Sequence, residues 1–105
     1  MQHFSQNLNF NESNLSTRIK KKNMVKAMYM TYSNVARSCK IVGINRSTHY
    51  RWIKNDKKYM AAIDEVNEIR LDESEAALFK LITQGNTKAI KFFLSTKGRH
   101  RGYHS

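Results

Sequence analysis

The chain has 105 residues, no proline and a formal net charge of +11. This length allows one small folded unit with an appended helical arm and excludes a large active-site cleft. The single cysteine cannot form an internal disulfide, and the longest apolar run, residues 59–63, is far shorter than the about 18 residues of a membrane span, so we expect a soluble protein of a reducing compartment that is not secreted.

Residues 1–17 are rich in asparagine and carry too few apolar side chains for a core, which predicts a disordered N-terminal arm. A basic run follows, and we expect its lysines to contact phosphate. The first folded helix is predicted from about Asn23 to Tyr32. Its apolar face is expected to pack on the two helices that follow, through Val25, Met28, Tyr29 and Tyr32.

The stretch from Ser33 to Trp52 has the pattern of two short helices joined by a tight turn. Ser33 and Asn34 can cap the first helix, and Gly43 can take the left-handed conformation that ends it. Ile44 then enters the core. The inward positions of this first helix are expected to be Val35, Ala36, Cys39 and Val42.

The second short helix has one polar and cationic face. Asn45 is a suitable N-cap, and Trp52 and Ile53 are expected to turn inward. A helix with such a face suits the major groove of DNA, so the sequence predicts a helix-turn-helix domain over residues 18–56. The candidate DNA-binding residues are Lys20, Lys21, Lys22, Arg37, Arg46, Ser47, Thr48, Tyr50, Arg51 and Lys54.

Positive charge is concentrated on this domain, because residues 18–58 hold twelve Lys or Arg and one acid. Residues 59–85 hold two basic and six acidic residues, and the remainder is basic again. A focused positive field attracts polyanions, which favours double-stranded DNA over a membrane surface as the partner. A solvated basic face without a ligand is the alternative.

From residue 57 the pattern predicts a long helix to Gln84, which Gly85 ends, and a second helix that Asn86 caps and that folds back antiparallel. A break at Asp72, followed by a separate helix, is the alternative that this pattern leaves open. We interpret residues 57–97 as an oligomerisation region, because several apolar side chains lie off the main stripes. The candidate interface residues are Met60, Ile63, Leu71, Phe79 and Phe92.

The acidic residues of this region do not indicate an enzyme. A helical pattern spreads them over solvent faces, without a convergent histidine or a glycine-rich phosphate loop. The four histidines have no spacing typical of a metal site. We therefore expect no enzymatic activity, cofactor, metal or small-molecule substrate.

Two segments carry a family resemblance. The run from Gly43 to Trp52, GINRSTHYRW, resembles the turn and recognition helix of phage and mobile-element DNA-binding domains. The run from Gly85 to Tyr103, GNTKAIKFFLSTKGRHRGY, resembles the end of the small terminase subunits of tailed bacteriophages. His49 departs from the pattern, because such helices usually place an aliphatic residue there.

The resemblance implies an all-α protein of the host cytoplasm that binds viral DNA at the packaging start site, forms a homo-oligomeric ring and recruits the large terminase motor subunit. It assigns the motor contact to the basic tail, residues 98–105, through Arg99, Arg101 and Tyr103. The alternative is a helix-turn-helix transcriptional regulator or a transposase DNA-binding subunit, which would use the same DNA-binding domain.

Overall fold

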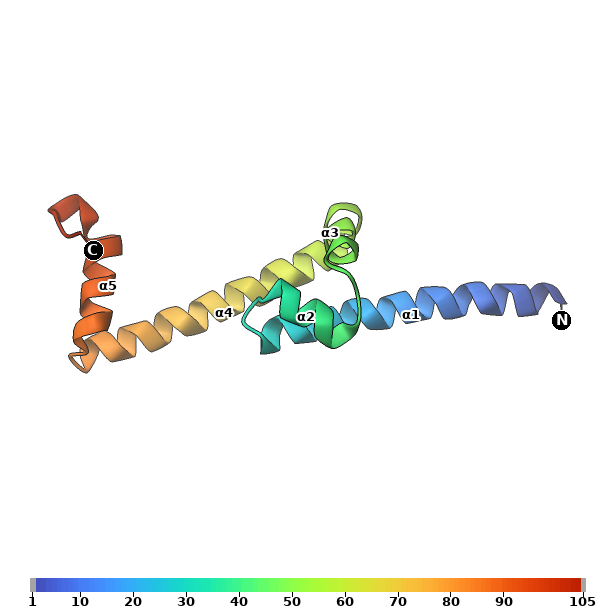
Figure 1. The fold of residues 1–105 in the computed structure, drawn as a ribbon, viewed down its shortest axis with the longest axis horizontal. Helices are drawn as coiled ribbons and strands as arrows, with labels where there is room; N and C mark the ends of the chain where they lie inside the picture. Colours follow the sequence, from blue (N-terminus) through green and yellow to red (C-terminus); the bar gives the residue numbers. More distant parts are fainter. Residues whose placement is uncertain (1, 105) are drawn as a thin grey trace. The chain divides into compact units, whose positions relative to one another are not determined.

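The computed structural model describes the backbone of residues 2–104 and the side chains of residues 15–104. In this part of the chain every regular element is a helix, as predicted, and there is no strand (Figure 1). The helices are α1 (Gln2–Met30), α2 (Val35–Val42), α3 (Arg46–Asn55), α4 (Lys57–Thr83) and α5 (Thr87–Lys97), followed by a short 3-10 helix, η1 (Arg99–Arg101). The chain divides into two units, residues 1–70 and 71–105.

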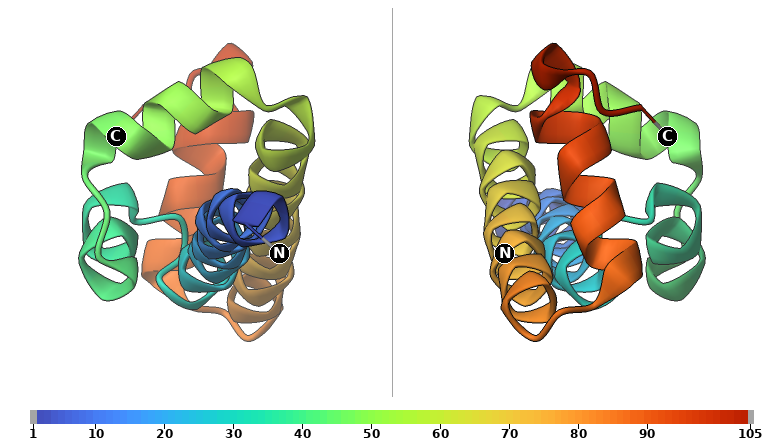
Figure 2. Two further views of the ribbon diagram at one scale, coloured as in Figure 1. Left: turned by 90° about the vertical axis from the view of Figure 1, so that its right-hand side faces the viewer. Right: turned by 90° about the vertical axis from the view of Figure 1, so that its left-hand side faces the viewer.

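In the first unit, α1 and the first half of α4 lie side by side and run in the same direction. The Lys21 ammonium donates to the Asp56 carboxylate just before α4 begins. Further along both helices, the Arg70 guanidinium donates to the Tyr29 carbonyl near the end of α1. Figure 2, in which α1 is seen nearly end on, shows α4 beside it. The buried cluster between the helices consists of Met24, Met28, Cys39, Tyr59, Ile63 and Val66.

This core extends beyond residue 56, the expected end of the helix-turn-helix domain. Tyr59, Ile63 and Val66 of α4 supply half of the buried cluster, because α1 to α3 alone leave the inner face of α1 uncovered. On α1, Met24 and Ala27 are buried, whereas the expected core residue Tyr32 is exposed. Of the expected face, Met28 is buried and Val25 packs against the core, so the pattern identified the helix and part of its buried face.

The turn between α1 and α2 has an unusual backbone. Tyr32 and Ser33 have φ angles of 55° and 66°, in the left-handed region that non-glycine residues seldom adopt. Side chains of α4 hold both residues: the Ser33 hydroxyl donates to the Asn67 side chain, and the Arg70 guanidinium lies 3.9 Å from the Tyr32 ring centroid. The turn therefore depends on α4. Contrary to the prediction, Ser33 does not cap α2, and Asn34 does.

The connection between α2 and α3 follows the prediction closely. Gly43 is left-handed, with φ of 84°, and its N–H donates to the Cys39 carbonyl. Ile44 packs against the core, as do Val35 and Val42 of α2. Ala36 differs from its predicted inward position, because it lies on the exposed side of α2.

The two asparagine caps are not equivalent. The Asn34 side chain accepts a hydrogen bond of 3.0 Å from the Arg37 N–H, whereas Asn45 precedes α3 without a side-chain capping bond. We expect Asn34→Ala to lower the free energy of unfolding by about 1 kcal/mol, a usual value for a lost N-cap. Asn45→Ala is the matched control and should cost less than half as much. Urea denaturation followed by circular dichroism measures both, and equal losses would contradict the assignment.

In the second unit, α4 continues without a break at Asp72, so the prediction of one long helix is confirmed. Gly85, with φ of 81°, follows the end of α4, and the Asn86 side chain accepts from the Ala89 N–H at 2.9 Å. The predicted antiparallel hairpin is not formed among the described residues of this unit. After the turn at Gly85, α5 points away from the axis of α4 instead of returning along it (Figure 1).

Residues 18–22 belong to α1, so the helix begins well before the expected Asn23. Most of the predicted disordered arm, residues 1–17, lies outside the residues whose side chains are described. Within the described part of the chain, no helix combines the length and the apolar character that crossing a membrane requires.

Candidate nucleic-acid interface

Helix α3 presents two different faces. Its outward side chains are polar or cationic and all exposed: Arg46, Ser47, Tyr50, Arg51 and Lys54. Thr48 lies at the edge of this face and is half-buried. On the other side, His49 is buried, and Trp52 and Ile53 pack against the core. The sequence therefore assigned the outward and inward positions of this helix correctly.

His49 fixes α3 to α4. Its Nδ1 atom lies 2.7 Å from the Tyr59 hydroxyl oxygen, and the two rings meet edge to face at 5.6 Å between centroids. Burial lowers the pKa of His49 and raises the pKa of Tyr59, because it disfavours the charged form of each group. The unusual histidine is thus accommodated as a neutral core residue whose partner is supplied by the next helix.

A second anchor joins α1 to the connection between α3 and α4. The Lys21 ammonium donates to the Asp56 carboxylate at 2.8 Å and lies 5.4 Å from the Trp52 ring centroid. The Asp56 carboxylate also accepts from the Tyr59 N–H at 3.0 Å. The bond from Lys21 and this backbone bond lower the pKa of Asp56. Lys21 therefore differs from the other candidate phosphate contacts, because it already has an anionic partner.

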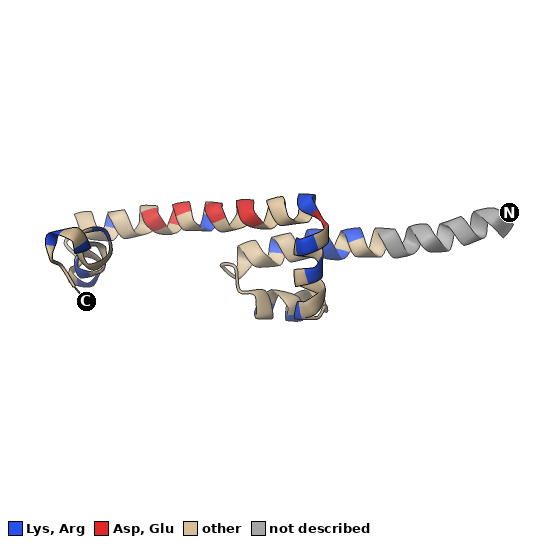
Figure 3. Ribbon diagram, turned by 90° about the horizontal axis from the view of Figure 1, so that it is seen from above, with Lys and Arg blue, Asp and Glu red and all other residues tan. Residues whose placement is uncertain are grey.

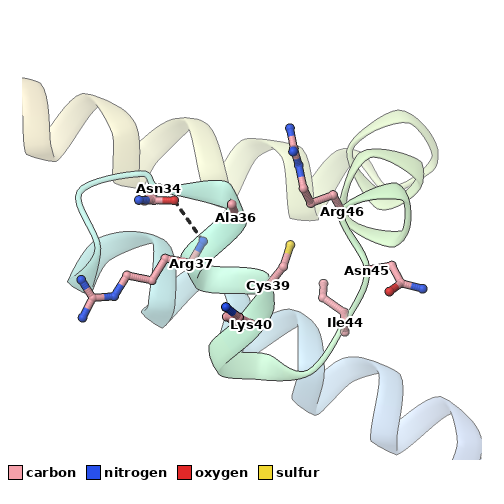
Figure 4. Close-up of a pocket in the computed structure, with 8 residues that line it drawn as sticks. All are labelled: Asn34, Ala36, Arg37, Cys39, Lys40, Ile44, Asn45 and Arg46. Carbon is pink, nitrogen blue, oxygen red and sulfur yellow. Dashed lines mark hydrogen bonds between the residues drawn. The ribbon is translucent and has the colours of Figure 1, made fainter.

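A shallow hollow of about 640 Å³ lies between α2 and the start of α3 (Figure 4). Arg46 projects from the start of α3, whereas Arg37 projects from the outer side of α2 in a different direction. Lys40 also lines the hollow and is exposed. Lys40 was not among the predicted DNA-binding residues. Its position in the last turn of α2, three residues after Arg37, was the signal that could have identified it. Cys39 forms part of the floor, and burial raises the pKa of its thiol.

The remaining candidate lysines lie on α1. Lys20 and Lys22 are both exposed, and Lys22 lines a second hollow, between α1 and the start of α4. Figure 3 shows Lys and Arg along the described part of α1 and on α2 and α3, and Asp and Glu along α4. The structure thus keeps the separation of charge that the sequence predicted and places the basic residues on more than one face.

The candidate interface residues divide into two groups. Met60, Leu71, Phe79 and Phe92 are exposed. Ile63 is only 4% exposed and belongs to the core cluster, so its assignment to an oligomer interface is corrected. The periodic pattern placed Ile63 on an apolar stripe of α4, and α1 covers that stripe within the same chain.

The predicted tail residues Arg99, Arg101 and Tyr103 are all exposed. They lie in or just after η1, a turn of helix that the sequence did not predict. Among the described residues, no three His, Cys, Asp or Glu side chains gather in a group that could hold a metal ion.

The chain was compared with protein-family models, with curated proteins and with solved structures, and no significant match was found in any of the three.

Proposed function

We propose that the first unit is a helix-turn-helix domain that binds double-stranded DNA with α3 in the major groove. The observation that carries the proposal is the outward face of α3. Its exposed residues are cationic or hydrogen-bonding, while its inner face is fixed through the His49–Tyr59 hydrogen bond. A rigid helix with such a face can hold donors and acceptors against base edges.

The charge of the first unit supports the same proposal. Basic residues precede α3 on α1 and α2 and follow it at the start of α4, so the helices next to the proposed recognition helix in the sequence are basic as well. DNA affinity arises largely from such contacts to phosphate, whereas base contacts confer specificity. A solvated basic face would have the same charge without any preference for one DNA sequence.

Arg51→Ala tests the base contact. If Arg51 reads a guanine with two hydrogen bonds, the variant should lose about 1–3 kcal/mol of binding free energy on the specific duplex and relax specificity at one base pair. Lys40→Ala should instead weaken all duplexes alike and reduce the salt slope of binding by about 1. Fluorescence anisotropy titrations across a salt series, on duplexes selected by the wild-type protein and on random duplexes, measure both effects.

Lys80→Ala provides the control, because Lys80 is exposed on α4 outside the proposed interface. Lys21 is unsuitable as the phosphate variant, since its loss would leave Asp56 without its cation. Unchanged affinity of the Arg51 and Lys40 variants for every duplex would overturn the proposal.

We propose further that the protein acts as a phage terminase small subunit, which binds viral DNA and recruits the large motor subunit without enzymatic activity of its own. The support is the resemblance of residues 43–52 and 85–103, together with the exposed apolar residues of α4 and α5. The alternative, a transcriptional regulator or transposase subunit, requires only a dimer. A homo-oligomer larger than a dimer that retains a co-expressed large terminase subunit on an affinity column would favour packaging, and a strict dimer on a palindromic site would favour regulation.

A further inference from the structure

The middle of α1, from Leu15 to Val25, and the start of α4 line a hollow of about 610 Å³ in the first unit. Its apolar lining includes Leu15 and Ile19, each 48% exposed. Arg18 and Lys22 lie at the same hollow. These four residues recur at helical spacing, so they share one face of α1. This face, which we call the basic groove, combines two exposed apolar side chains with two cations.

The middle of α4 carries a face with the opposite charge. Leu71 is 54% exposed and Phe79 is 68% exposed. Successive residues of an α-helix are rotated by about 100°, which places these two apolar residues on one side of α4 together with three exposed acids. This acidic face consists of Glu68, Leu71, Asp72, Glu75 and Phe79.

Each of the two faces lies mainly on residues outside the segment in which α1 and α4 pack. Within the first unit α1 and α4 pack in parallel, from the Lys21–Asp56 pair to the contact of Arg70 with Tyr29. The basic groove is built mainly on α1 residues that precede this packed segment. Along α4, the acidic face runs from Glu68 to Phe79.

We propose that the basic groove binds the acidic face of α4 from a second copy of this chain. Leu71 and Phe79 would bury their side chains against Leu15 and Ile19, and the three acids would face Arg18 and Lys22. The pairing matches apolar with apolar and anion with cation. Because the two joined surfaces are different, the contact is head-to-tail and repeats from copy to copy.

Charge selects this occupant among the surfaces of the chain. A second basic groove would be repelled, and α5 carries three lysines and no acid. The acidic face combines exposed acids with Leu71 and Phe79, the two large apolar residues of α4 with the greatest exposed fractions. This contact rests on the proposed function, because it would form the homo-oligomer of that function, and in it Lys22 serves assembly instead of DNA binding.

Charge reversal in the full-length chain tests the contact, with sedimentation equilibrium in the absence of DNA as the measurement. One variant carries Arg18→Glu and Lys22→Glu, and the other carries Asp72→Lys and Glu75→Lys. Each places like charges opposite each other across the contact, so each should weaken self-association by about tenfold or more.

Mixing provides the decisive measurement. In an equimolar mixture, the groove of each variant meets a face of opposite charge on the other variant, so association should return although each variant alone associates weakly. The chain with all four substitutions should associate by itself for the same reason. A variant with Lys20→Glu and Lys57→Glu has the same net charge as the groove variant and should associate as the wild type does, since neither lysine lines the groove.

A wild-type chain that stays monomeric at tens of micromolar would overturn the proposal, as would two variants that fail to recover on mixing. Equal weakening by the Lys20 and Lys57 control would also overturn it. Circular dichroism of every variant establishes that α-helix content is retained. DNA binding is measured separately by anisotropy, so loss of this contact and failure of the proposed DNA-binding function give different results.

Discussion

Met24→Ala is expected to lower the free energy of unfolding by about 2–5 kcal/mol, the usual range for removing a large buried side chain. Met24 is 0% exposed and lies at the centre of the cluster that joins α1, α2 and α4. Small domains are stable by only about 5–15 kcal/mol, so this substitution should remove a large part of the stability of the first unit.

Met30→Ala is the matched control for this prediction. Met30 lies on the same helix and undergoes the same chemical change, but it is 72% exposed. It should cost under about 0.5 kcal/mol, as surface substitutions usually do. Urea denaturation followed by circular dichroism and by Trp52 fluorescence measures both variants. Similar losses for the two would show that the cluster does not stabilise the fold as described.

Local signals predicted the short-range structure well. Gly43 and Gly85 mark helix ends because the left-handed backbone that they adopt favours glycine, and Asn34 and Asn86 cap the following helices. Such features depend on residues within one turn of a helix, so one sequence suffices to find them. The continuity of α4 through Asp72 follows from the same local pattern.

The long-range contacts were less accessible to sequence reasoning. The pattern showed that Tyr59 and Ile63 are inward residues of a helix, but it could not show that α1 would cover them. The same limit produced the expected antiparallel hairpin, because an apolar stripe on α5 does not identify the helix that it packs against. Periodicity identifies the buried face of a helix, but it does not identify the element that packs against that face.

The candidate interface shows the same division. The outward residues of α3 followed from spacing alone, whereas the reason that this face is held in place lies in contacts across 10 to 35 residues of sequence. His49 departs from the aliphatic pattern of α3, and the hydrogen-bond partner that accommodates it, Tyr59, lies on the next helix. The sequence does not distinguish Lys21 from Lys20 and Lys22, whereas the ion pair with Asp56 gives it a structural role.

The buried His49 predicts a dependence of stability on pH. Burial lowers its pKa in the folded protein, so between the folded and unfolded pKa values the unfolded chain binds a proton that the folded chain does not. A fall in pH therefore favours unfolding. The free energy of unfolding should decrease as the pH falls below about 6.5, the ordinary pKa of histidine, with a slope from this group of up to about 1.4 kcal/mol per pH unit.

His49→Gln is the variant that isolates this contribution, because glutamine can hydrogen-bond to the Tyr59 hydroxyl and does not titrate. The measurement is urea denaturation of both proteins at a series of pH values from 7.5 to 5, above the range in which the lowered pKa of Asp56 becomes important. The wild-type protein should lose stability more steeply than the variant over this window. Since His49 joins α3 to α4, the same protonation should loosen the proposed recognition helix. Parallel slopes for the two proteins would show that His49 does not determine the pH dependence of stability.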